Sequence, residues 1–373
     1  MLFFFIFLSL FGGISFYIWA RLYQGIKCAI PHINTIVYIV VSAIISLSPF
    51  IGFVQFPTAI KRMFMWIGSY WMAIFVYMFL VLLVTDIMFL VGRILKLVPD
   101  PAMFRFCAAA SAVVITLLAI TYGRANATFL HHTSYEIKTK TESFPEGLNI
   151  VLVSDLHLGA LNSETMLQRM AEEINKLSPD IVCIAGDIFN NDVNAIRDPG
   201  RAIELFKRIN ATHGVFASLG NHDGGSTFNE MLSFLAQGNI TVLKDEHAVI
   251  DNRLALVGRL DPSPIRGFGG LRRKSAADVL AQTEAGLPVI VMDHNPANIG
   301  EYGSGVELVL SGHTHRGQIF PGNVITKAIF PVHYGHFQKD NDSPHIVVTS
   351  GISTWGMPLR IGSNNEIVSI TLR

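Results

Sequence analysis

The chain has 373 residues, half of them hydrophobic, and it carries 28 acidic and 28 basic side chains. A mean hydropathy of +0.42 excludes an ordinary soluble globular protein. The charges are unevenly distributed. Residues 1–122 carry seven Lys or Arg and two acidic residues, whereas residues 123–373 carry 21 Lys or Arg and 26 acidic residues. We therefore expect two different parts joined end to end.

Residues 1–122 are predicted to form a transmembrane region. A helix needs about 20 apolar residues to cross a hydrocarbon core roughly 30 Å thick. Four almost charge-free stretches reach this length, and we predict one helix in each: 2–20, 33–56, 63–92 and 104–122. Buried helices of a soluble protein are the alternative, but four consecutive stretches of this length disfavour it. A secretory signal peptide would explain only the first stretch, which lacks the usual basic segment before it.

The short loops predict an orientation. Loops 21–32 and 93–105 hold five Lys or Arg together, against two in loop 57–66. Basic short loops tend to stay cytoplasmic, so we expect a multi-pass protein of the cell (inner) membrane, with both termini and the large domain outside the cytoplasm. Asp86 lies close in sequence to Arg93 and is expected at the membrane interface.

Residues 123–149 are polar and are expected to be a linker that passes into an edge strand. From residue 150 onward, short apolar runs alternate with amphipathic segments, which indicates an α/β domain over residues 150–373. A helix is predicted after the first run, with Ser163 as its N-cap and apolar residues at i, i+4 spacing from Met166. The expected strands are 150–155, 181–187, 214–223, 254–258, 288–294, 306–313, 345–351 and 366–372.

Side chains that can bind metals follow five of these strands. They are Asp155 and His157, then Asp187, then Asn221, His222 and Asp223, then His294, and last His313 and His315. In open α/β sheets, ligands bind beyond the carboxyl ends of the strands, so we expect these side chains to converge. Gly312 and Gly317 are expected to free the backbone, so that both rings of the last pair turn inward.

Imidazole, carboxylate and amide donors without thiolates suit Zn, Fe or Mn. The candidate ligands number seven, which is enough for two divalent ions that share one carboxylate: Asp155, His157, Asp187, Asn221, His294, His313 and His315. Two cations about 3.5–4 Å apart can hold a hydroxide as nucleophile and stabilise an in-line displacement at phosphorus. Such a reaction also needs an acid to protonate the leaving group, and His222 is the candidate.

These residues resemble the motifs of the calcineurin-like metallophosphoesterase family. The motifs are D-x-H at 155–157, G-D at 186–187, G-N-H-D at 220–223, H at 294 and G-H-T-H at 312–315, in the order of that family. The segment from Ser350 to the C-terminus is similar to the ending of the family. The resemblance implies a four-helix transmembrane region followed by a two-sheet α/β/β/α sandwich, with metals at the strand ends.

The resemblance also implies individual roles. Asp155, His157 and His315 would bind one metal, Asp187 would bridge, and Asn221, His294 and His313 would complete the other metal site. His222 would be the catalytic acid, oriented by Asp155 or by Asp223. The membrane segments are similar to those of a membrane-attached branch of the family, some of whose members cleave the pyrophosphate of UDP-diacylglucosamine.

We therefore predict a membrane-anchored dinuclear-metal enzyme that hydrolyses a phosphoester or pyrophosphate bond, with a phospholipid or nucleotide-linked lipid as the candidate substrate. The alternatives are a tethered phosphatase with non-lipid substrates and a non-catalytic metal-binding sensor or scaffold. The net charge of −5 on residues 123–373 disfavours a nucleic-acid partner, because such binding needs a basic surface.

Several basic residues keep two interpretations. Arg316 could contact a substrate phosphate or be solvated or salt-bridged. The run Arg272–Lys274 is expected to be the solvated start of a helix. His333 and His336 are candidate residues at the rim of the site.

Overall fold

The computed structural model describes residues 2–53, 58–140, 144, 146–161 and 164–373. The predicted N-cap Ser163 and part of the predicted linker lie outside the described residues. The chain divides into two compact units, residues 1–125 with the short segment 356–358, and residues 126–355 with 359–373.

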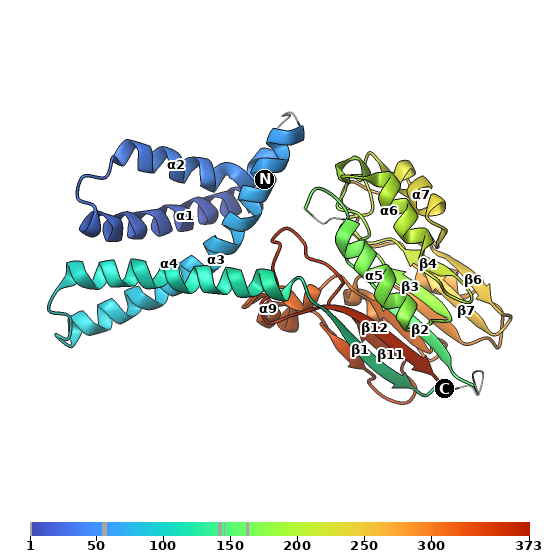
Figure 1. Ribbon diagram of the computed structural model, residues 1–373. Helices are drawn as coiled ribbons and strands as arrows, with labels where there is room; N and C mark the ends of the chain where they lie inside the picture. The colour runs from blue at the N-terminus through green and yellow to red at the C-terminus, as the bar shows by residue number, and fades with distance from the viewer. Residues whose placement is uncertain (1, 54–57, 141–143, 145, 162–163) are drawn as a thin grey trace. The chain divides into compact units, whose positions relative to one another are not determined.

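The first unit is entirely helical (Figure 1). Its helices are α1 (Leu2–Ala29), α2 (Thr35–Leu47), the 3-10 helix η1 (Ser48–Phe53), α3 (Thr58–Ile94) and α4 (Pro101–Asn126). Only three helices in the described residues are long and apolar enough to cross a membrane, and they span Phe5–Ala29, Ile60–Ile94 and Pro101–Asn126.

The prediction of four spanning helices was therefore wrong for the stretch 33–56. The 13 residues of α2 cover only about 20 Å at 1.5 Å per residue, against roughly 30 Å of hydrocarbon. Pro49 lies directly after α2, within η1. Because proline removes a backbone donor and clashes with the preceding turn, the α-helix gives way here to the 3-10 helix η1.

The second unit contains two six-stranded mixed sheets. The first has the order β1-β12-β2-β3-β4-β5, with strands β1 (Leu130–Ile137), β12 (Asn365–Leu372), β2 (Leu148–Val153), β3 (Ile181–Ala185), β4 (Val215–Ser218) and β5 (Ile240–Val242). Strands β2, β3, β4 and β5 are parallel, whereas β12 is antiparallel to β2 and parallel to β1. The expected edge strand is therefore present as β1.

The second sheet has the order β10-β11-β9-β8-β7-β6, with strands β10 (Gly335–Phe337), β11 (His345–Val348), β9 (Leu308–Ser311), β8 (Val289–Met292), β7 (Leu254–Gly258) and β6 (Glu246–Ile250). Its four central strands are parallel, and both edge strands are antiparallel to their neighbours. Continuous apolar runs such as that of β9 are typical of strands covered on both faces.

The two sheets pack face to face, with helices on the outer faces. Buried side chains of both sheets, among them Leu152, Cys183, Ile290 and Leu310, form one apolar core between them. The outer face of the first sheet packs on α5 (Glu164–Lys176), α6 (Pro199–Lys207) and α7 (Phe228–Gln237) (Figure 1). The outer face of the second packs on α8 (Ala276–Leu280) and η3 (Pro296–Glu301). The expected α/β/β/α sandwich is confirmed.

Three short elements complete this unit, η2 (Val193–Ala195), η4 (His315–Gly317) and α9 (Gly322–Ile329). Helix α9 has no buried residue.

Candidate metal centre

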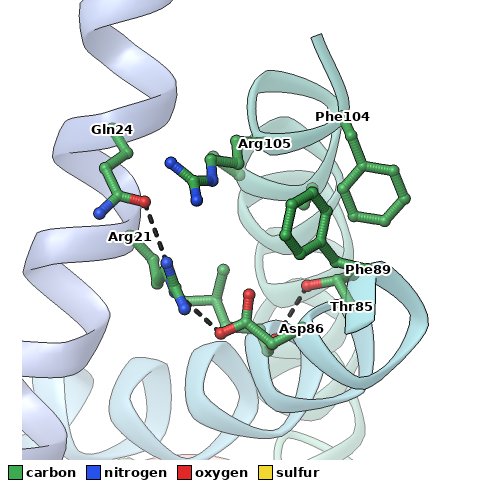
Figure 2. Close-up of a pocket in the computed structure, with 10 residues that line it drawn as sticks. Arg21, Gln24, Thr85, Asp86, Phe89, Phe104 and Arg105 are labelled. Atoms are coloured by element: carbon green, nitrogen blue, oxygen red, sulfur yellow. Dashed lines mark hydrogen bonds and ion pairs between the residues drawn. The ribbon is translucent and has the colours of Figure 1, made fainter. Parts of the chain in front are cut away.

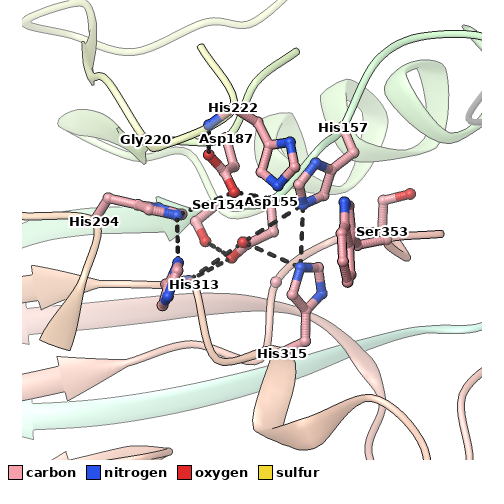
Figure 3. Close-up of polar contacts among 12 residues, drawn as sticks. Ser154, Asp155, His157, Asp187, Gly220, His222, His294, His313, His315 and Ser353 are labelled. Carbon is pink, nitrogen blue, oxygen red and sulfur yellow. Dashed lines mark hydrogen bonds and ion pairs between the residues drawn. The ribbon is translucent and has the colours of Figure 1, made fainter. Parts of the chain in front are cut away.

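The two sheets bring their polar strand ends together at one place (Figure 3). Asp155 and His157 follow β2, Asp187 follows β3, and Asn221 and His222 follow β4, all from the first sheet. His294 follows β8, and His313 and His315 follow β9, from the second sheet. Because parallel strands present their carboxyl ends at a common edge, each sheet contributes its own set of donors.

One group of donors forms around Asp155. Its Oδ1 atom lies 3.3 Å from His315 Nε2 and 3.9 Å from His157 Nε2, and the two histidine nitrogens are 3.1 Å apart. All three side chains are buried. Two imidazole nitrogens that face each other beside a carboxylate are arranged as ligands of a common cation.

A second group forms around Asp187. Its Oδ2 atom lies 3.1 Å from His294 Nε2, and His313 Nδ1 lies 3.3 Å from the same His294 nitrogen. Asn221 Oδ1 is 3.0 Å from His313 Nδ1. Asp187 also reaches the first group, because its Oδ2 is 3.6 Å from His157 Nε2. It is the carboxylate that both groups share.

The donor set fits divalent cations. The His and Asp ligand atoms lie within 4.8 Å of one another in each group and also in a third set, His157, Asp187 and His222, which links the two groups. Burial lowers the pKa of His157 to about 3 and that of His313 to about 4. Burial and the neighbouring Arg360 hold the pKa of His315 well below its ordinary value. Neutral imidazole is the form that binds metals, so these three rings stay available as ligands.

Asp187 and His294 shift each other's pKa. Burial opposes charge on both, but their mutual attraction and hydrogen bond outweigh burial, so the pKa of Asp187 is lowered and that of His294 is raised well above its ordinary value. The field of the buried carboxylates therefore favours a positive charge at this position. A divalent cation would meet the same requirement.

The backbone at the centre is unusual. Five donor residues have positive φ: Asp155 at 57°, His157 at 46°, Asp187 at 53°, His313 at 69° and His315 at 48°. Few residues other than glycine adopt such values, although Asp and His do so more often than most. Such conformations cluster at functional sites.

The two glycines near His313 and His315 act differently. Gly317 has φ of 75°, as expected for a residue that frees the backbone. Gly312 does not have positive φ, and its importance is spatial, because a Cβ atom there would collide with Ser154 Oγ and Asp155 Oδ2. The second sheet thus approaches the first without a side chain between them.

His222 has a different orienting partner from the two expected. The Asn191 side-chain Nδ2 donates to His222 Nδ1 over 2.9 Å, and the His222 backbone N–H donates to Asp187 Oδ1 over 2.8 Å. In the described residues neither Asp155 nor Asp223 makes a hydrogen bond to the ring. With the amide nitrogen facing Nδ1, the contact corresponds to the neutral ring; with the amide turned so that Oδ1, which has no partner in the described residues, faces Nδ1, the contact corresponds to the imidazolium.

Asp223 is a structural link between two loops of the first sheet. It accepts from the Phe189 backbone N–H and from the Gly220 backbone N–H, both over 2.8 Å. Burial and the nearby Asp187 raise its pKa to about 7. It lies beside the donor groups and holds the loop that carries Asn221 and His222.

Two arginines at the centre have no motif that marks them. Arg360 is completely buried and donates to the backbone oxygens of His315 and Ser350, over 2.9 and 2.7 Å, and to Ser353 O. Arg273 makes two hydrogen bonds to Asp293, the residue before His294, over 3.0 and 2.8 Å. The expected solvated run Arg272–Lys274 is therefore wrong for Arg273.

The remaining candidates have defined neighbours. Arg316 stacks on the Tyr334 ring with its Cζ 4.2 Å from the ring centroid, and the Thr314 hydroxyl donates to the His333 backbone oxygen over 2.6 Å. The His336 ring bonds to the His345 ring over 2.9 Å. Sequence patterns did not mark Trp355, which is half exposed and has its ring 5.6 Å from that of His222.

Comparison with known proteins places these residues in a family. Residues 148–317 match the calcineurin-like phosphoesterase family. A metallophosphoesterase of Aquifex aeolicus is 30% identical over 262 residues, which cover 69% of this chain and 98% of that protein. A Danio rerio transmembrane protein with a metallophosphoesterase domain is 30% identical over 70% of this chain and 62% of its own length.

Other matches are more partial. A metallophosphoesterase of Helicobacter pylori is 31% identical over 60% of this chain, and the matched region spans only 60% of that relative. A Thermus thermophilus crystal structure superposes with a TM-score of 0.38 at 12% identity, covering 56% of this chain and 92% of that chain.

Proposed function

This chain belongs to the calcineurin-like metallophosphoesterase family, and from that premise we propose that it hydrolyses phosphoester or pyrophosphate bonds with two divalent metal ions at a membrane surface. The observation that carries the proposal is the convergence of donors from both sheets into two groups that share Asp187. A single cation would leave one group without a partner.

The residues divide between the two proposed metal positions. Asp155, His157 and His315 would hold one ion, Asn221, His294 and His313 the other, and Asp187 both. When bound, the ions would supply Lewis-acid chemistry and a nucleophile available at neutral pH. Mn, Fe and Zn all suit such a mixed oxygen and imidazole set.

The protein's own residues complete the reaction. His222 would act as the acid in its imidazolium form, donating the Nε2 proton to the leaving oxygen, while the Nδ1–H proton is held by the side-chain amide of Asn191, whose Oδ1 has no other partner in the described residues. Trp355, beside His222, borders the side from which the leaving group departs. Arg360 fixes the His315 backbone and so keeps one ligand in place.

The experiment uses full-length protein in detergent with Mn²⁺ and follows hydrolysis of bis-p-nitrophenyl phosphate. We expect Asp187→Asn to abolish turnover and His222→Ala to reduce it by about 10²-fold or more. Asp251→Asn and His131→Ala are the matched controls, because both residues are exposed and distant in sequence from the donor set. Equal activity of all five proteins would refute the proposal.

A lipid-linked substrate is supported by the surface that follows the centre. Between η4, which holds His315, and Phe330, whose ring lies 5.7 Å from His313, the chain exposes four large apolar side chains. These are Phe320, Val324, Ile325 and Ile329, each between 49% and 66% exposed. An apolar surface beside the centre, in a chain with membrane-spanning helices, suits a substrate presented by a bilayer.

This part of the proposal has its own test. The ratio of phospholipid to bis-p-nitrophenyl phosphate turnover is measured in mixed micelles for Ile325→Ser and for Phe337→Ser, an exposed apolar residue outside this segment. We expect the ratio to fall at least severalfold only for Ile325→Ser. An unchanged ratio, with the soluble activity intact, would favour a tethered phosphatase with non-lipid substrates.

A further inference from the structure

A polar pocket lies between three helices of the first unit (Figure 2). Arg21 of α1 donates to Asp86 of α3 over 2.8 Å and to Gln24 over 3.0 Å, and the Tyr17 hydroxyl donates to Asp86 over 2.7 Å. Asp86 therefore pairs across the helix bundle with a residue 65 positions away.

The pocket lies near one end of the bundle. Helices α1 and α3 run in the same direction, because Phe11 contacts Phe75, Tyr17 contacts Phe79 and Arg21 contacts Asp86. Arg21 and Asp86 each precede the end of their helix by eight residues, about 12 Å at 1.5 Å per residue. Arg105 is four residues after the start of α4, about 6 Å by the same rise.

The charges in this pocket are not balanced. Its lining contains the arginines Arg21 and Arg105 but only one acid, Asp86. Arg21 is paired with that acid, whereas Arg105 has no carboxylate within 4 Å among the described residues and lies over the Phe89 ring at 5.4 Å. Figure 2 shows the Arg105 guanidinium directed toward Gln24 and Arg21. Arg105 is exposed and the pocket itself measures only about 10 Å³, so an anion would bind at the mouth of the pocket, where Arg105 has no carboxylate partner.

We propose that Arg21, Gln24 and Arg105 bind the phosphate of an anionic phospholipid. Guanidinium groups form bidentate bonds with phosphate oxygens, and basic pockets between transmembrane helices bind such head groups. Because α1 and α3 end on the same side, the five Lys and Arg of loops 21–32 and 93–105 gather at this end of the bundle, which predicts that it is cytoplasmic, where anionic lipids concentrate. The apolar side chains Leu82, Phe89 and Phe104 in the lining suit a lipid and disfavour free phosphate.

The pocket is lined only by residues of α1, α3 and α4, so this lipid is proposed as a ligand of the helices and not as the substrate. The lipid would instead bind to α1, α3 and α4 together and stabilise their packing.

The test uses full-length protein in phosphatidylcholine nanodiscs with increasing phosphatidylglycerol, and retained lipid is measured by native mass spectrometry. We expect Arg105→Gln to weaken phosphatidylglycerol retention about tenfold. Arg93→Gln removes the same charge from the last turn of α3, outside the pocket, and should leave retention unchanged. Asp86→Asn raises the net charge of the pocket and should strengthen retention, a gain that a purely structural role of Asp86 would not give.

Equal losses in Arg105→Gln and Arg93→Gln would overturn the proposal in favour of diffuse attraction at the interface. Competition by millimolar glycerol phosphate in pure phosphatidylcholine nanodiscs would overturn the lipid assignment in favour of a soluble phosphate ligand. Arg105→Lys is the control for unfolding of Arg105→Gln. It keeps the positive charge and should retain more lipid than Arg105→Gln does. Phosphodiester hydrolysis is not used as a readout, so this proposal and the proposed function can fail separately.

Discussion

The hydrogen bond from Asn191 to His222 allows a specific prediction about proton donation. Replacing Asn191 by Gly removes the amide and suits the backbone, because Asn191 has φ of 64° and glycine adopts such values without strain. Without this amide the Nδ1 side of the His222 ring loses its hydrogen-bond partner, so the orientation of the ring toward the leaving oxygen is no longer fixed. We expect slower departure of the leaving group.

The expected loss of rate can be estimated from the contacts that His222 keeps in the variant. The His222 ring still contacts His157 at 5.0 Å and Trp355 at 5.6 Å between ring centroids, and its backbone N–H keeps the bond to Asp187. The variant therefore loses about one hydrogen bond, worth about 0.5–1.5 kcal/mol, or about 2- to 13-fold in rate. Loss of the acid itself costs about 10²- to 10⁴-fold, which is the upper limit for any residue acting through it.

The assay is a double-mutant cycle of Asn191→Gly and His222→Ala, followed on two phosphodiesters with different leaving groups. We expect the Asn191 effect to be larger for the more basic leaving group and to vanish in the His222→Ala background, because coupled residues are not additive. Asn190→Gly, in the next position of the same loop, is the control. An equal slowing by Asn191→Gly with and without His222 would show that the amide acts on something else.

Three further changes test the surroundings of the centre. Arg360→Met leaves the backbone oxygens of His315, Ser350 and Ser353 without their donor, so urea unfolding should show a loss of about 3 kcal/mol or more, against none for the exposed Arg253→Met. Gly312→Ala places a methyl group against Ser154 and Asp155 and should cost about 1–3 kcal/mol together with bound metal, measured by elemental analysis. Chelation should lower the thermal midpoint of the wild type, because an ion at a hundredfold excess over Kd contributes about 2.7 kcal/mol to stability. The Asp187→Asn variant should show a smaller drop on chelation. A drop identical to that of the wild type would contradict the role of Asp187 as shared ligand.

The fold could be predicted from the sequence largely because parallel strands buried on both faces are continuous apolar runs. The runs that end at Ser154, Ala185 and Ser311 mark β2, β3 and β9, and the polar residues that follow them could be assigned to strand ends before the structure was known. Short or half-exposed strands carried a weaker signal. The exposed strand β10, the half-exposed β6 and the three-residue β5 were missed for this reason.

The membrane region shows a different limit. An average over apolar residues treats Pro49 as one more apolar position, so the stretch 33–56 looked long enough to span. The prediction for Asp86 rested on its neighbours along the sequence, such as Arg93, and could not include a partner on another helix. Its partner Arg21 comes from another helix, and only the packing of α1 on α3 brings them together.

The donor set was predictable, whereas its supports were not. Metal-binding residues follow strands at fixed spacings, but Asn191, Arg360 and Arg273 contact the centre through hydrogen bonds between loops that are distant in sequence. Their residue types are common in solvated loops. Burial alone distinguishes Arg360 from an ordinary surface arginine, and burial of a loop residue is a property of the folded chain.

These supports explain how the donor residues keep their backbone conformation. Residues in sparsely populated φ/ψ regions cost about 1–3 kcal/mol each, somewhat less for Asp and His, and Asp155, His157, Asp187, His313 and His315 all have positive φ. Such a cost persists only where the surroundings over-determine the geometry, as Asp223 does with two backbone bonds and Arg360 does around His315. Loss of a support should therefore lower metal affinity before it unfolds the domain, since the loops that carry the donors relax first.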